Sequence, residues 1–119
     1  MTALRFPSSA STAVLLLGAA LAASVAQPAA AESADCRRAS GPVETAICST
    51  PVLTALDAKI AERYGTAIRG YDAASAEALR RDQRAFLAAR NAVGARLTGA
   101  DLIEELTDQL TRREAFLTD

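Results

Sequence analysis

After residue 40, hydrophobic residues recur at steps of three and four, which is the spacing of one face of an α-helix. The clearest stripe predicts a long helix over residues 51–70. Thr50 precedes Pro51 as a candidate N-cap, and Gly70 marks the predicted end. The apolar positions of this stripe are Leu53, Leu56, Ile60, Tyr64, Ala67, Ile68 and Tyr71.

A second stripe predicts a helix over residues 75–97. Its seam repeats at steps of four and three, yet two of its positions, Gln83 and Arg90, are polar. Buried polar residues in a helical seam often fix the register of the helices. The full seam reads Leu79, Gln83, Phe86, Arg90, Val93 and Leu97.

Two more helices are predicted at the ends of this region. Thr98 to Asp101 fits a capping box that begins the last helix. A helix of at most two turns is predicted over residues 43–49, with Pro42 at a first helical position. The stripe of the last helix is Leu102, Ile103, Leu106, Leu110, Arg113 and Phe116 or Leu117.

No alternating strand pattern appears after the first 31 residues. Helices that are joined by short loops pack antiparallel. We therefore expect an all-α fold: a small antiparallel bundle of three main helices, preceded by a short N-terminal helix.

The first 31 residues have the pattern of an export signal. Arg5 supplies a positive start, and Ala13–Val25 is an apolar run. Cleavage is expected after Ala31, before Glu32, with a cut after Ala26 as the alternative. A membrane anchor is the other interpretation, but the apolar run is shorter than the roughly 20 residues that a span needs.

This pattern divides the chain into a signal peptide, residues 1–31, and one domain, residues 32–119. We expect the domain to be periplasmic or secreted, with no stable membrane insertion after cleavage. Cys36 and Cys48 are its only cysteines, and in an oxidising compartment they are expected to form one disulfide. On the chain-entropy model, closing this loop stabilises the fold by about 3 kcal/mol.

Composition argues against several classes of function. The chain has no histidine, the commonest general base and metal ligand, and its cysteine spacing is not that of a zinc or redox motif. Without the signal, 12 basic side chains face 14 acidic ones, which argues against nucleic acid as a partner. We expect no enzyme, no cofactor and no metal. A glycosidase-like carboxylate pair stays an alternative to a solvated face for Glu104, Glu105 and Asp108.

The polar seam residues have two interpretations. Gln83, Arg84 and Arg90 either form a patch that faces a partner, or Arg90 pairs with an acidic residue such as Asp57 or Glu44 and holds the helices in register. The structural interpretation is favoured. We therefore name Asp57, Gln83 and Arg90 as a structural polar seam.

Several short motifs occur together in this chain. The block Val43–Cys48 reads Val-Glu-x-x-Ile-Cys, Leu56 and Asp57 follow, and Gln83–Leu87 reads Gln-Arg-x-Phe-Leu. With Asp35, Cys36, Pro51, Leu53, Tyr64, Arg90 and Asn91, this combination resembles the LprI family of exported bacterial proteins. The resemblance covers about residues 35–110.

The resemblance implies a helical, disulfide-linked envelope protein that binds a lysozyme and needs no cofactor. The implied activity is inhibition of a lysozyme-type muramidase through protein–protein blockade. Exposed polar residues are the candidate contacts, because an arginine can bond catalytic carboxylates directly; these are Arg37, Arg38, Glu44 and Arg84. The alternative is a non-inhibitory envelope interaction or adaptor module.

The chain departs from the family pattern at four places. Phe86 replaces the usual Trp, and Asn91 replaces Asp. Many members carry a second cysteine pair, for which this chain has Val93 and a residue near Asp101. The connection between the last two helices is therefore expected to be looser, or to be held by packing of Val93 and Leu97.

Overall fold

The computed structural model describes residues 33–119 and confirms an all-α fold in that part of the chain. Four helices run through it and no strand occurs there. The predicted signal peptide, residues 1–31, lies outside the described residues. The helices are α1 (Gly41–Ser49), α2 (Pro51–Gly70), α3 (Ala73–Val93) and α4 (Gly99–Phe116).

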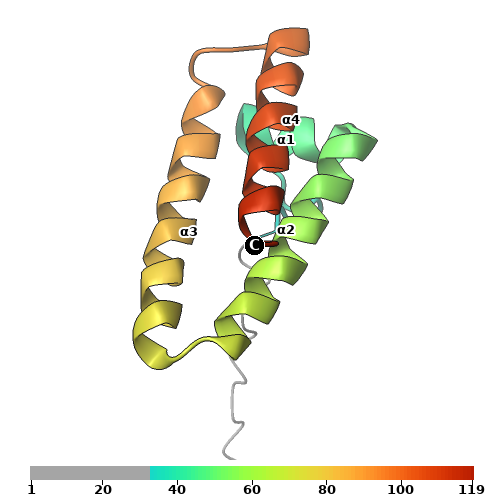
Figure 1. Cartoon of the computed structure of the whole chain (residues 1–119). Coiled ribbons are helices and arrows are strands. Elements are labelled where there is room, and N and C mark those ends of the chain that lie inside the picture. The colour runs from blue at the N-terminus through green and yellow to red at the C-terminus, as the bar shows by residue number, and fades with distance from the viewer. Residues whose placement is uncertain (1–32) are drawn as a thin grey trace, which may run out of the picture.

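The three long helices form an up-down arrangement (Figure 1). Helices α2 and α3 make an antiparallel hairpin, and α4 runs back beside both of them. The short helix α1 packs against all three long helices near the end that carries the α3–α4 connection. Helix α4 stops well before the level of the α2–α3 turn, so it does not cover the far end of the hairpin.

All four helices contribute to one hydrophobic core. The predicted apolar stripes supply most of it, because each stripe faces the other helices. Leu97 and Leu117 pack against its edge. The buried members of this core are Val43, Ile47, Leu53, Ile60, Val93, Leu102, Leu106 and Leu110.

Three residues of the predicted stripes lie at the surface instead. Tyr71 is 52% exposed, Ile103 is 36% exposed and Phe116 is 58% exposed. Tyr71 follows the last residue of α2, where the backbone turns to an extended conformation. Of the two alternatives at the end of α4, Leu117 packs on the core and Phe116 does not.

The bounds of α3 differ from the predicted range of 75–97. The helix begins at Ala73 because Asp72 is its N-cap and accepts a hydrogen bond from the Ser75 backbone N–H at 3.0 Å. It ends at Val93, and a turn over residues 94–97 follows. The backbone N–H of Leu97 donates to the Val93 carbonyl in this turn.

The predicted capping box places the start of α4 correctly at Thr98, but the capping hydrogen bond that it implies does not form. Thr98 is the N-cap residue of α4, but its side chain makes no capping hydrogen bond. Gly99 has a left-handed φ of 58°, so Thr98 does not precede a regular first turn of the kind that a capping box requires. Thr50, the predicted N-cap of α2, likewise makes no side-chain cap.

Packing holds the α3–α4 connection. Val93 is fully buried and Leu97 lies against the core. Gly94 approaches α1 so closely that a Cβ atom there would lie 2.7 Å from Pro42 Cγ and 2.9 Å from Val43 Cγ2. Only glycine fits this approach without a shift of α1. Of the two alternatives for this connection, the structure therefore supports apolar packing.

The expected disulfide is present and ties the leading segment to α1. Cys36 and Cys48 are bonded, with their Cα atoms 5.5 Å apart. Because Cys48 lies in the last turn of α1, the bond holds the segment around residues 33–40 beside the bundle. Within the described part of the chain, no helix is both long and apolar enough to cross a membrane.

Candidate functional site

A buried ion pair joins α2 to α3. Asp57 and Arg90 are each only 4% exposed, and Arg90 Nη1 donates to Asp57 Oδ1 at 3.0 Å. The other carboxylate oxygen, Oδ2, accepts a hydrogen bond from the backbone N–H of Ala34 at 2.8 Å. Asp57 therefore contacts three segments at once: its own helix, α3, and the segment that the disulfide holds.

Arg90 is buried, and the net effect of its surroundings is to lower its pKa. Desolvation lowers the pKa of Arg90, while the negative charges of Asp57 and, to a smaller degree, Glu44 raise it. Arg90 Nε also donates to the Asn91 side-chain oxygen at 3.2 Å. Asn91 thus supplies a neutral acceptor, where a carboxylate would add a further charge.

A second buried arginine lies between α3 and α4. Arg113 Nε and Nη2 both donate to Gln83 Oε1, at 3.0 and 2.6 Å. Its Nη1 makes an ion pair with Asp82, whose side chain is half exposed. We name these three residues the Arg113 cluster. Sequence reasoning placed Arg113 in the stripe of the last helix but assigned it no partner.

Two phenylalanines flank the Arg113 guanidinium. Its central carbon lies 5.0 Å from the ring centroid of Phe86 and 5.0 Å from that of Phe116. These distances are typical of cation–π contacts. Gln83 is 1% exposed, yet its Nε2 has no hydrogen-bond partner among the described residues. The cluster is thus less completely paired than the Asp57–Arg90 site.

Asp57, Gln83 and Arg90, the predicted polar seam, are all buried, but they belong to two separate clusters. Asp57 and Arg90 form the ion pair between α2 and α3. Gln83 instead binds Arg113 of α4. A signal for Arg113 was present in the sequence, because it is a charged residue in an apolar stripe, as Arg90 is.

The four predicted contact residues are spread over the surface. Arg37 and Arg38 are exposed in the turn after Cys36. Glu44 is half buried on α1, where it accepts a hydrogen bond from the Ser40 backbone N–H. Arg84 lies on the exposed face of α3, near Glu77 and two further arginines. The structure therefore does not gather the four residues at one point.

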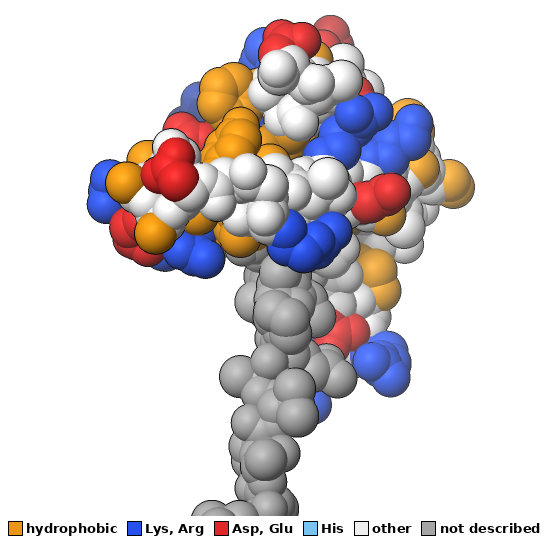
Figure 2. Space-filling model, turned by 60° about the horizontal axis from the view of Figure 1, so that its bottom comes forward, with side chains coloured by type: hydrophobic (Ala, Val, Ile, Leu, Met, Phe, Trp, Pro, Cys, Tyr) orange, Lys and Arg blue, Asp and Glu red, His pale blue; other side chains and the backbone are white. Residues whose placement is uncertain are grey.

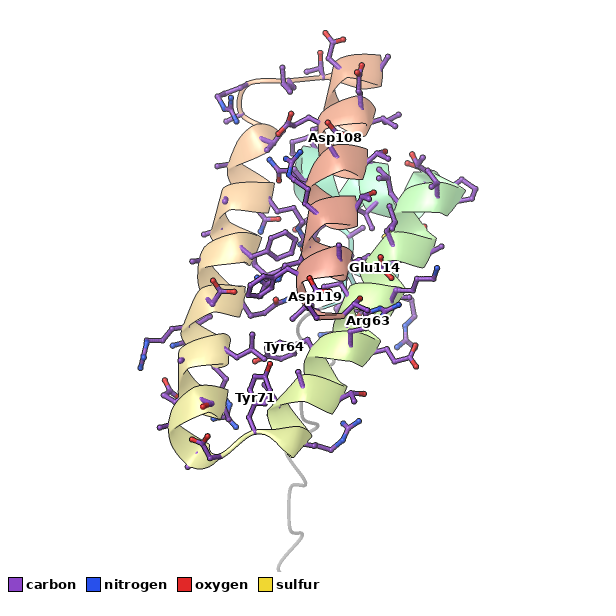
Figure 3. All side chains as sticks on the ribbon, viewed as in Figure 1. Arg63, Tyr64, Tyr71, Asp108, Glu114 and Asp119 are labelled. Carbon is purple, nitrogen blue, oxygen red and sulfur yellow. A yellow bond between two sulfur atoms is a disulfide. The ribbon has the colours of Figure 1, made fainter. Side chains whose placement is uncertain are left out.

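A groove opens where α4 ends above the α2–α3 turn. We call it the α4-end groove; Tyr71, Leu79, Asp82, Phe116 and Asp119 are among the residues that line it, and its volume is about 660 Å³. Figure 3 shows Tyr64 and Tyr71 between α2 and α3, beyond the end of α4, with Asp119 above them. Sequence reasoning missed this groove, because a helical pattern does not show where a neighbouring helix stops.

A metal centre receives no support from the described part of the chain. Across residues 33–119, no three side chains of His, Cys, Asp or Glu gather closely enough to hold a metal ion. The carboxylates Glu104 and Asp108 lie exposed on α4, in agreement with a solvated helix face. Glu105 accepts a hydrogen bond from Gln109 on the same helix.

Comparison with known proteins identifies a family. No curated protein and no solved structure matches the chain significantly. The family model described as "Lysozyme inhibitor LprI" matches residues 36–114, which is more than half of the chain. That range begins at the first cysteine of the disulfide and includes the Asp57–Arg90 pair and the Arg113 cluster. The chain therefore belongs to the LprI lysozyme inhibitor family.

Proposed function

We propose that the protein is an exported inhibitor of a lysozyme-type muramidase and acts by protein–protein blockade. The observation that carries this proposal is the family match, which spans the whole helical bundle from the disulfide to the last turn of α4. The match includes the residues that shape the fold as well as those at its surface. The proposed partner is a lysozyme, and the proposed mechanism needs no bond-making by this chain.

The disulfide supports export. A bond between Cys36 and Cys48 persists in an oxidising compartment such as the periplasm or the extracellular space. The predicted signal peptide at residues 1–31 would deliver the domain, residues 32–119, to such a compartment. There the protein would meet muramidases that act on the cell wall.

The architecture suits a blocking role. Binding costs less when the binding surface is already ordered before contact. Here the leading segment is held twice, by the disulfide and by the hydrogen bond from Ala34 to Asp57. Arg37, Arg38, Arg84 and Glu44, the contacts predicted from the sequence, are one candidate set of polar groups for the carboxylates and basic groups of the partner's cleft.

Lysis of cell walls gives the test. The purified oxidised domain is titrated against lysozymes of several classes while the turbidity of a cell-wall suspension is followed. The proposal expects saturable slowing of lysis by at least one lysozyme at near-stoichiometric ratios. Unchanged lysis by every lysozyme at large molar excess would refute it. Capture of a different envelope protein in that case would favour the adaptor module.

The doubly substituted Cys36→Ser/Cys48→Ser variant is the matched control for this assay. If the disulfide orders the inhibitory surface, the variant inhibits more weakly at a temperature where circular dichroism shows that it is still folded. If the disulfide acts only on stability, the folded variant inhibits as well as the natural protein.

A further inference from the structure

The α4-end groove collects exposed aromatic surface that the fold itself does not use. Four large hydrophobic side chains are exposed among residues 33–119, namely Val52, Tyr71, Ile103 and Phe116. Two of them, Tyr71 and Phe116, line this one groove. Figure 2 looks at this end of the molecule and shows hydrophobic side chains gathered in the middle of the face, with charged side chains around them.

Phe116 packs against Arg113 in the protein without a partner. Its ring lies 5.0 Å from the central carbon of Arg113. Arg113 is itself held by two hydrogen bonds from its guanidinium to Gln83 and by its ion pair with Asp82. A large aromatic side chain that is exposed yet ordered loses little entropy on binding, which is a property of interface hot spots.

Carboxylates are the charged groups that line the groove itself. Asp82 and Asp119 line it, and none of its described lining residues is Lys or Arg. Among the described side chains, Asp119 has no ion-pair partner, and Asp82 binds Arg113 through Oδ2 while its Oδ1 has no partner. The groove therefore offers carboxylate oxygens beside an aromatic surface.

A third carboxylate stands at the same end of the bundle. Asp72 follows Tyr71 in the α2–α3 turn and caps α3 through the backbone N–H and the hydroxyl of Ser75, another lining residue. These two hydrogen bonds lower the pKa of Asp72, so it stays ionised at all physiological pH values.

We propose that the α4-end groove is the surface that docks the muramidase, and that it takes an apolar side chain adjacent to a Lys or Arg on a partner of net positive charge. This proposal rests on the proposed function for the identity of the partner. Phe116 and Tyr71 supply the apolar contact, and Asp82 and Asp119 receive the cation. Asp119, which makes no ion pair with a described side chain, attracts the basic group of the partner at short range.

Affinity measurements on two variants test the docking surface. Phe116→Ala removes the aromatic contact and is expected to weaken the binding of a basic lysozyme at least tenfold. Val52→Ala is its matched control, because Val52 is 52% exposed but lies at the start of α2. We expect the control to bind within twofold of the natural protein.

Charge reversal gives a second test that does not depend on Arg113 packing. Asp119→Lys is expected to accelerate dissociation, because the carboxylate lies in the groove. Asp101→Lys, an exposed substitution in the first turn of α4, changes net charge equally and is expected to affect association alone. An acidic lysozyme is expected to bind the natural protein more weakly than a basic one.

The outcomes separate this proposal from the proposed function. If the natural protein inhibits a lysozyme and both Phe116→Ala and Asp119→Lys inhibit it equally well, the groove proposal is overturned and the inhibitor function stands. Loss of binding on Arg84→Ala with both groove variants unaffected would overturn it in favour of the sequence-predicted contacts. If the natural protein binds no lysozyme, both proposals fail.

Discussion

The two buried arginines of this bundle have opposite surroundings. Arg90 binds the buried carboxylate of Asp57, which also accepts a hydrogen bond from the segment that the disulfide holds. Arg113 binds the neutral amide of Gln83 and the half-exposed carboxylate of Asp82, and Phe116 covers it beside a groove. Arg90 joins α2 and α3 at the end of the bundle that α1 and the disulfide cover, which we call the closed end. Arg113 supports the surface at the other end, which we call the open end, where α4 stops before the α2–α3 turn.

This difference distinguishes a site that holds the helices together from a site that can contact a partner. At the Asp57 end each carboxylate oxygen has a donor, and the donors come from α3 and from the leading segment. At the Arg113 end one buried amide nitrogen, Gln83 Nε2, has no partner among the described residues, and exposed aromatic area remains. Gln83 Nε2 is buried and out of reach of a partner, so it is the exposed aromatic surface that makes this end the better candidate for contact with another protein.

The largest expected effect comes from breaking the closed end. Asp57→Ala leaves Arg90 buried without its carboxylate and removes the acceptor of the Ala34 backbone N–H. We expect a loss of about 3–5 kcal/mol in the free energy of unfolding, measured with urea. The double variant Asp57→Leu/Arg90→Met should recover much of this loss, because no unpaired charge stays buried. A cost near zero for Asp57→Ala would contradict the structural role of the pair.

Removing the disulfide should cost slightly less. For Cys36→Ser/Cys48→Ser we expect a loss of about 3 kcal/mol on the chain-entropy model. The disulfide and Asp57 act on the same leading segment, so combining these substitutions with Asp57→Ala should give a loss smaller than the sum. Combination with Arg113→Met should be additive. Equal coupling to both arginine sites would show that the two ends are not independent.

Breaking the open end should cost less than breaking the closed end. Arg113→Met keeps an apolar side chain between the phenylalanines and leaves Asp82, which is half exposed and can be solvated by water. We expect a loss of about 1–2 kcal/mol, from the hydrogen bonds to Gln83. Urea unfolding of Arg113→Met and Arg90→Met in parallel compares the two sites directly. A larger loss for Arg113→Met would reverse the assignment of roles.

The smallest expected effect is at the exposed cap of α3. In the folded protein the pKa of Asp72 lies below its ordinary value of 3.8, because the backbone N–H and hydroxyl of Ser75 bond its carboxylate. The ionised cap therefore stabilises the fold above that pH, and this contribution is lost as the pH falls through the folded-state pKa. Asp72→Ala should lower the melting temperature slightly at pH 7, and the decrease should become smaller as the pH falls below 3.8. An equal decrease above and below that pH would show that the ionised cap is not the cause.

The sequence predicted the helices well, because their stripes are long and regular. Glycine and proline marked the bounds of α2 correctly, from Pro51 to Gly70. The end of α3 was placed too late because Leu97 continues the apolar spacing, although it packs on the core from a turn and not from a helix. Spacing alone does not distinguish these two ways of burying a leucine.

The partners of the buried polar residues were harder to predict. A charged residue in an apolar seam indicates that a partner exists, and for Arg90 the candidates were Asp57 and Glu44. The choice of Asp57 depends on how α2 and α3 pack in three dimensions. Gln83 was grouped with Asp57 and Arg90 because it shares their seam, yet it faces α4. Tyr71 and Phe116 are exposed because α4 ends before the hairpin does, and no local pattern records that.

Hydrogen–deuterium exchange in the presence of a basic lysozyme tests the central contrast between the two ends. The account predicts slower exchange on binding in residues 71–82 and 113–119, which border the α4-end groove, with no change around the disulfide and Asp57. Protection confined to residues 36–57, with the groove unchanged, would contradict it.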